Sequence, residues 1–128
     1  MTRASRLPSL AGLILLGGCL GSPADPGTVC TLEARAGITV EILDGTGTIP
    51  LADGSVLTLK EGSYVETVSE AVDGRYLSGA WERAGTYDVR IDREGHVPWR
   101  SAGIEVASDG CHVQTVALTA PMVELNRS

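Results

Sequence analysis

Three cysteines, Cys19, Cys30 and Cys111, carry the most distinctive chemistry in this sequence of 128 residues. An odd number of cysteines cannot pair completely within one chain, so one thiol needs another explanation. Cys19 stands apart from the other two, because it directly follows the only long apolar run, residues 7–18. The sequence therefore indicates one role for Cys19 and a different, shared role for Cys30 and Cys111.

The residues before Cys19 have the parts of an export signal. Arg3 and Arg6 precede the apolar run, and small residues end it. A helix needs about 20 apolar residues to span a bilayer, and this run is shorter. We therefore expect a secretory signal and not a membrane-spanning anchor.

The segment Leu16-Gly17-Gly18-Cys19 resembles the lipobox of bacterial lipoproteins, which has an aliphatic residue, two small residues and a cysteine. The resemblance implies a diacylglycerol on the Cys19 thiol, removal of residues 1–18 as a lipoprotein signal peptide, and acylation (typically with palmitate) of the new amine. Two or three acyl chains give stable anchoring. Leu20, and not Asp, follows Cys19, which by resemblance to enterobacterial sorting rules favours the outer membrane. An ordinary secretory signal in which Cys19 occurs by chance is the alternative.

The remaining 110 residues are enough for one domain. Eight basic residues then stand against sixteen acidic ones, a net charge of −8, which makes nucleic acid a poor partner. We expect a tether over residues 19–28, rich in proline and glycine, then one domain over residues 29–122 and a loose tail over residues 123–128. The acyl chains, and not a basic surface, would hold this acidic domain at the membrane.

Cys30 and Cys111 lie at opposite ends of the predicted domain. An exported protein is in a compartment where disulfides persist. A Cys30–Cys111 bond would close a loop of about 80 residues and contribute roughly 4–5 kcal/mol by the chain-entropy model. We predict this disulfide, with two free thiols or an intermolecular bond as the alternatives.

The elements that must position these cysteines are strands. Apolar and polar residues alternate through segments such as 38–42, 87–91 and 104–106, and Asp-Gly or similar turn pairs separate them. This pattern predicts an all-β fold, an antiparallel β-sandwich of about seven strands. Residues 63–72 fit a capped helix as well as a strand, and we expect a strand because the neighbouring segments are strands.

The run "ITVEILDGTGTIPLADGSVLTL" resembles the opening of carboxypeptidase regulatory-like domains, which have a transthyretin-like, Ig-like sandwich. "DGRYLSGAWERAGTYDVRIDREGHVPW" is similar to their central hairpin, and "GIEVASDGCHVQTVALT" to their last two strands. The positions that match are these: Asp44, Gly47, Pro50, Leu51, Gly54, Gly85, Tyr87, Val89 and Gly95. No peptidase domain accompanies them, so the resemblance implies a fold and not zinc chemistry.

No pattern in the sequence predicts a catalytic or metal site. His96 and His112 are the only histidines, and no HExxH or CxxC pair accompanies them. The Asp-Gly pairs are explained by turn geometry and do not form a calcium loop. A GxSxG elbow is absent. We therefore expect no metal and no cofactor.

The candidate binding surface consists of Trp99, Arg100 and Trp81. Trp99 lies between Pro98 and Arg100, and aromatic residues beside arginine are typical of protein or sugar contacts. For Trp99 itself, we favour a tryptophan that covers one end of the sandwich, and a binding role is the alternative.

Together these features predict a lipid-anchored, non-catalytic protein of the bacterial cell envelope that acts as an interaction or structural module. The expected partners are the membrane, through the lipid on Cys19, and a protein or glycan of the envelope. Which face of the membrane the domain occupies, periplasmic or surface, stays open. A module that binds carbohydrate or a small ligand is the alternative, and a small envelope enzyme is a more distant one.

Overall fold

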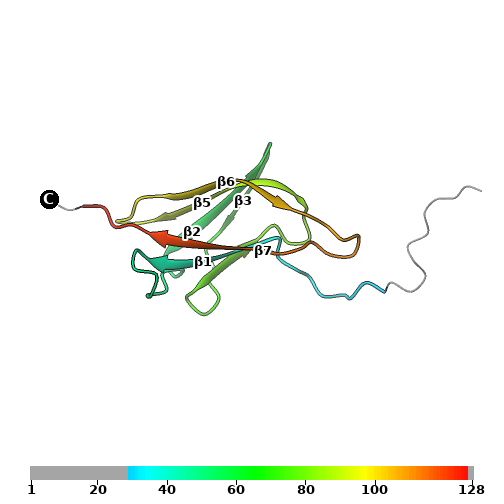
Figure 1. Ribbon diagram of the computed structural model, residues 1–128, viewed down its shortest axis with the longest axis horizontal. Coiled ribbons are helices and arrows are strands. Elements are labelled where there is room, and N and C mark those ends of the chain that lie inside the picture. The colour runs from blue at the N-terminus through cyan, green and yellow to red at the C-terminus, as the bar shows by residue number, and fades with distance from the viewer. Residues whose placement is uncertain (1–28, 127–128) are drawn as a thin grey trace, which may run out of the picture.

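Two β-sheets stacked on each other form the domain in the computed structural model, which describes residues 29–126 (Figure 1). The predictions for residues 1–18 and 19–28 concern a part of the chain outside that range. The strands are β1 (Ile38–Asp44), β2 (Ser55–Glu61), β3 (Tyr64–Val68), β4 (Tyr76–Gly79), β5 (Gly85–Arg93), β6 (Trp99–Val106) and β7 (Val116–Met122). Within the described range, no helix is long and apolar enough to cross a membrane.

The strand order is β4-β1-β7 in one sheet and β3-β2-β5-β6 in the other. All pairs are antiparallel except β1 and β7, which run parallel from Ile38 opposite Val116 to Asp44 opposite Met122. The predicted all-β sandwich of about seven strands is confirmed. The parallel pair is an additional feature, and it places the first and last strands side by side in the smaller sheet.

The alternation seen in the sequence places the core between the two sheets. In β5, Tyr87, Val89 and Ile91 are buried, and the residues between them face solvent. Tyr87 is a large, fully buried side chain, and its hydroxyl donates to the Arg83 carbonyl at 2.9 Å. The burial of this aromatic residue therefore leaves no polar atom without a partner. The other buried side chains of the cluster are Ile38, Val40, Ile42, Ala52, Leu57, Leu59, Leu77, Ala80, Val106, Val113, Ala120 and Met122.

The ambiguous segment, residues 63–72, begins with a strand, as predicted. Tyr64–Val68 forms β3 and pairs with β2 through a loop of two residues, Gly62 and Ser63. Gly62 has a φ of 56°, which suits the first position of a tight hairpin turn. Pairing along this hairpin explains why the strand forms in place of a helix.

The last described residues remain attached to the sandwich. After β7 ends at Met122, the amide of Val97 donates to the Val123 carbonyl at 2.8 Å, and the amide of Leu125 donates to the Gly95 carbonyl at 2.9 Å. Of the tail expected from residue 123 onward, the part up to Leu125 is therefore hydrogen-bonded to the loop between β5 and β6.

Candidate binding sites

The outer face of the four-stranded sheet carries a shallow groove between β2, β5 and β6. The inward side chains of these strands, such as Leu59 and Val89, are buried, so the alternate residues face solvent. The strand register places Lys60 opposite Asp88, and Thr58 opposite Arg90. The groove has a volume of about 360 Å³ and is lined by the outward side chains of these three strands, among them Thr58, Lys60, Asp88, Arg90, Arg100 and Ala102.

A β-bulge lies in β6 next to the groove residue Ala102. Val89 lies opposite Ser101, and Tyr87 lies opposite Ile104, so β6 has one more residue than β5 between these pairs. Gly103 has a φ of 69° within this segment, a conformation that glycine adopts without steric cost. The bulge bends this edge strand and reverses which of its residues face outward.

Positive charge is concentrated in this groove. Arg90 lies directly opposite Arg100 in the β5–β6 pair. Arg90 is neutralised by a two-pronged contact with Asp92, with Nε–Oδ2 and Nη2–Oδ1 distances of 2.7 and 2.8 Å. The ion pairs of residues 29–126 involve neither Lys60 nor Arg100. The groove therefore presents two cationic side chains to solvent.

Trp99, Arg100 and Trp81 do not form the single surface that the sequence suggested. Trp99 lies opposite the buried Ile91, faces inward and packs against the core, half-buried. Arg100, the next residue, faces the opposite side of the sheet and lines the groove. Trp81 is 54% exposed in the loop before β5, whereas Trp99 pairs with the far end of that strand. Arg100 alone of the three belongs to the groove.

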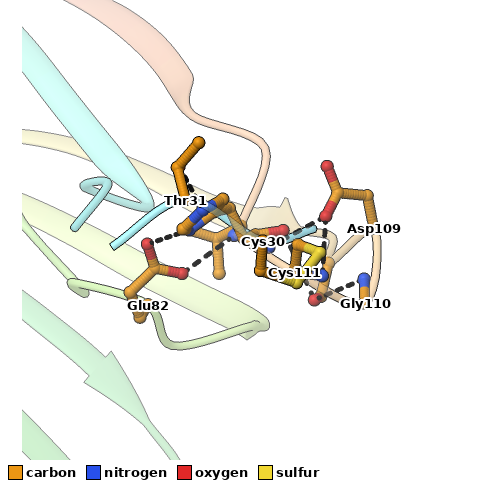
Figure 2. The surroundings of a disulfide bond; sticks show 9 residues. Cys30, Thr31, Glu82, Asp109, Gly110 and Cys111 are labelled. Atoms are coloured by element: carbon orange, nitrogen blue, oxygen red, sulfur yellow. Dashed lines mark hydrogen bonds and ion pairs between the residues drawn. A yellow bond between two sulfur atoms is a disulfide. The ribbon is translucent and has the colours of Figure 1, made fainter. Parts of the chain in front are cut away.

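The disulfide Cys30–Cys111 lies at the end of the sandwich where the N-terminal segment enters, with the two Cα atoms 5.2 Å apart (Figure 2). This bond confirms the predicted pairing. The Asp109 carboxylate accepts hydrogen bonds from the amides of His112 and Cys111, at 2.8 and 2.9 Å, and these bonds lower the pKa of Asp109. Hydrogen bonds between residues of the same turn therefore fix the position of Cys111.

His112 joins three separate segments beside the disulfide. Its side chain is nearly buried, and Nδ1 donates to Glu82 Oε1 at 2.7 Å. Nε2 lies 2.9 Å from the Thr31 hydroxyl. The hydrogen bond from His112 is the main reason that the pKa of Glu82 is lowered, and the amides of Arg35 and Val113 also donate to this carboxylate. Both ring nitrogens are engaged, and the contacts fasten the N-terminal segment to two loops.

The hydroxyl–imidazole–carboxylate order of Thr31, His112 and Glu82 is that of a hydrolase triad. Sequence reasoning missed the cluster, because its members lie 30 and 81 positions apart and form no local motif. The other histidine, His96, is hydrogen-bonded to the Glu94 carbonyl in an exposed loop. Among residues 29–126, no three His, Cys, Asp or Glu side chains gather in a way that could hold a metal ion.

The loop that carries Trp81 has an unusual backbone. Ala80 and Glu82, on either side of Trp81, have φ values of 54° and 50°, a region that non-glycine residues rarely adopt. Hydrogen bonds from the surrounding structure hold both: Gly37 donates to the Ala80 carbonyl at 3.0 Å, and Glu82 donates to the Arg35 carbonyl at 2.9 Å. The exposed indole is therefore presented from a backbone that is fixed on both sides.

No family model matches the chain, and no curated protein matches it. Among solved structures, the chain is similar to one from Bacteroides uniformis described as a "putative carbohydrate binding protein", with 18% sequence identity and a TM-score of 0.47. The match covers 68% of this chain and 40% of that one, so this chain spans well under half of that protein. The likeness to carboxypeptidase regulatory-like domains stays a prediction.

Proposed function

We propose that this protein is a lipid-anchored, non-catalytic module of the bacterial cell envelope, which acts through contacts between its β-sandwich and an envelope partner. The observation that carries the proposal is the Cys30–Cys111 disulfide. Disulfides persist in exported proteins, so the bond supports export. It also uses two of the three cysteines and leaves Cys19, which follows Leu16-Gly17-Gly18, as the residue available for a lipid.

The arrangement of the chain supports a defined orientation at the membrane. Cys30 lies eleven positions after Cys19, which is at most about 40 Å of extended chain. The described N-terminal segment enters at one end of the sandwich, and the last described residues, 123–126, lie at the opposite end (Figure 1). A lipid on Cys19 would therefore keep the disulfide end near the membrane and direct the loop at residues 94–97 away from it.

Replacement of the lipid site tests the proposal directly. In a bacterial host supplied with a labelled fatty acid, the native protein should carry label and sediment with membranes. Cys19→Ser should lose the label and either leave the membrane fraction or keep an uncut signal, because serine offers no thiol for the diacylglycerol. A protein that carries Cys19→Ser and is still cut and membrane-bound would show that the lipobox interpretation is wrong.

The matched control removes the other two cysteines. The double variant Cys30→Ser, Cys111→Ser keeps Cys19 and should still be labelled and membrane-bound, although it is less stable. Loss of label in this control as well would mean that labelling reports the folding of the domain and not the identity of residue 19.

A module that binds a small ligand is the second candidate function. The groove on the outer face of the four-stranded sheet favours it, because the groove brings exposed cationic side chains together on an acidic domain. For a small envelope enzyme, the Thr31–His112–Glu82 cluster is the hydroxyl–imidazole–carboxylate set that the described domain offers.

A further inference from the structure

The groove between β2, β5 and β6 is lined by three positively charged side chains, those of Lys60, Arg90 and Arg100. Lys60, Arg90 and Arg100 are three of the seven basic residues in the described range, which holds fifteen acidic ones. Arg75 and Arg83 pair with Glu41 and Glu61 elsewhere on the domain. The concentration of cations in one groove is therefore a local feature and does not follow from the overall charge.

The placement of Arg100 opposite Arg90 is unfavourable for the ligand-free protein. Like charges directly across an antiparallel pair destabilise a sheet. The Asp92 carboxylate offsets the charge of Arg90, because both of its oxygens are hydrogen-bonded to that guanidinium group. Arg100 has no ion-pair partner among residues 29–126. A negatively charged ligand would relieve this arrangement.

The chemistry of the available groups defines what such a ligand should carry. A guanidinium group has a planar fork of N–H donors that matches the two oxygens of a carboxylate. Lys60 adds a second positive charge in the same groove, and Asp88, opposite Lys60 in the strand register, offers only acceptor oxygens when ionised. A carboxylate next to hydroxyl groups would satisfy all three side chains.

We propose that this groove binds a carboxylated saccharide, with the Arg100 guanidinium on the sugar carboxylate, Lys60 supporting the same charge and Asp88 accepting from the sugar hydroxyls. The inference goes beyond the proposed function and does not depend on the lipid anchor, since every residue involved lies in the described domain. It assigns the class of ligand and the residues that contact it.

The size and lining of the groove favour a saccharide over other anionic partners. Its volume of about 360 Å³ is in the range of small-ligand sites. The Asp88 carboxylate disfavours a dense polyanion such as polyphosphate. None of the groove's lining residues is aromatic, so a neutral sugar would lack a ring to stack on.

Titration calorimetry on the full-length, detergent-extracted protein tests the inference with three probes: an oligogalacturonate, the neutral galactose oligomer of the same length, and an acidic peptide of equal charge. We expect heat of binding with the oligogalacturonate alone, and an affinity that falls as salt is raised. No binding of the oligogalacturonate, or equal binding of the neutral oligomer, would overturn the proposal. Equal binding of the peptide would overturn the choice of saccharide.

Variants locate the site. Arg100→Ala should lower the affinity for oligogalacturonate about tenfold or more, because a hydrogen bond to a charged group is lost. Arg100→Lys should recover part of that loss, and Lys60→Gln should weaken binding as well. The matched control, Arg75→Ala, removes a charge that lies in the turn before β4, away from the groove, and should leave the affinity unchanged. Equal losses for Arg75→Ala and Arg100→Ala would mean that only the overall charge matters.

Stability provides a separate readout for Arg100. The ligand-free Arg100→Ala variant should melt at the same temperature as the native protein or higher, because it removes a repulsion and not a core contact. A lower melting temperature together with weaker binding would show that Arg100 supports the fold and would overturn its role in contacting the ligand.

Discussion

Removal of the Cys30–Cys111 disulfide should destabilise the domain strongly without changing its fold. The perturbation is the double variant Cys30→Ala, Cys111→Ala, in which neither thiol remains to mispair. The sheets do not contain either cysteine, since β1 begins at Ile38 and β7 begins at Val116. The core cluster and the strand pairing should therefore be retained, and the effect should come mainly from the unfolded chain.

The magnitude follows from the size of the closed loop. The bonded cysteines are 81 positions apart, for which the chain-entropy model gives about 4.5 kcal/mol at 25 °C. Residues 29–35 are exposed, so the native chain without the bond regains freedom there and part of this effect is lost. We expect a decrease of about 3 kcal/mol in the free energy of unfolding, within the range of 2–5 kcal/mol observed for small secreted domains.

Thermal and urea unfolding of the native protein and the variant measure this difference. For a domain of this size, about 3 kcal/mol corresponds to a decrease of roughly 12–24 °C in Tm. Reduction of the native protein should produce the same decrease, and the oxidised, folded protein with Cys19 replaced should show no titratable thiol. A decrease in Tm below about 5 °C, or two titratable thiols before reduction, would refute the reasoning.

The two tryptophans should respond differently to truncation. Trp99→Ala should lower the free energy of unfolding by about 2–3 kcal/mol, because the indole packs against the core. Trp81→Ala should change it by about 0.5 kcal/mol or less, because that side chain is 54% exposed. Similar decreases for both variants would contradict the placement of Trp99. Asp44 accepts hydrogen bonds from the Ile49 amide and the Thr46 hydroxyl, and these lower its pKa to about 2. A lowered folded-state pKa stabilises the fold above the unfolded value, near 4, and this contribution disappears as the pH falls toward 2. The Tm difference between the native protein and Asp44→Asn should thus be constant from pH 5 to 7 and narrow between pH 4 and 2, and a difference independent of pH would count against this account.

The strands could be predicted because alternation of apolar and polar residues is visible within a short segment. The disulfide could be predicted from the chemistry of the cysteines. Alternation in segments such as residues 87–91 requires only that one face be buried, and the structure buries Tyr87, Val89 and Ile91. The pairing of Cys30 with Cys111 followed from the number of cysteines and from the predicted export of the protein. Neither prediction required knowledge of which strands are neighbours.

The orientation of Trp99 could not be predicted, because one residue changes the count along β6. Counting back in twos from the inward-facing Ile104 would place Arg100 inside and Trp99 outside. The extra residue near Gly103 reverses this, so that Trp99 faces the core and Arg100 faces the groove. A single bulge glycine thus decided which of the two candidate residues could reach a ligand.

The position of the disulfide also determines how the described domain would respond to a pulling force applied between its N-terminal segment and its C-terminal end. Tension that enters at Cys30 passes through the sulfur bridge to Cys111 and continues along the last strand. Residues 31–110, which include β1 to β6, lie in the covalent loop and carry none of it once the bridge is taut. Only residues 111–126 can be drawn out, about 50 Å of chain, compared with about 330 Å for residues 29–126 if the bond were absent. The disulfide thus limits the extension of this domain to the length of its final strand and the segments that flank it.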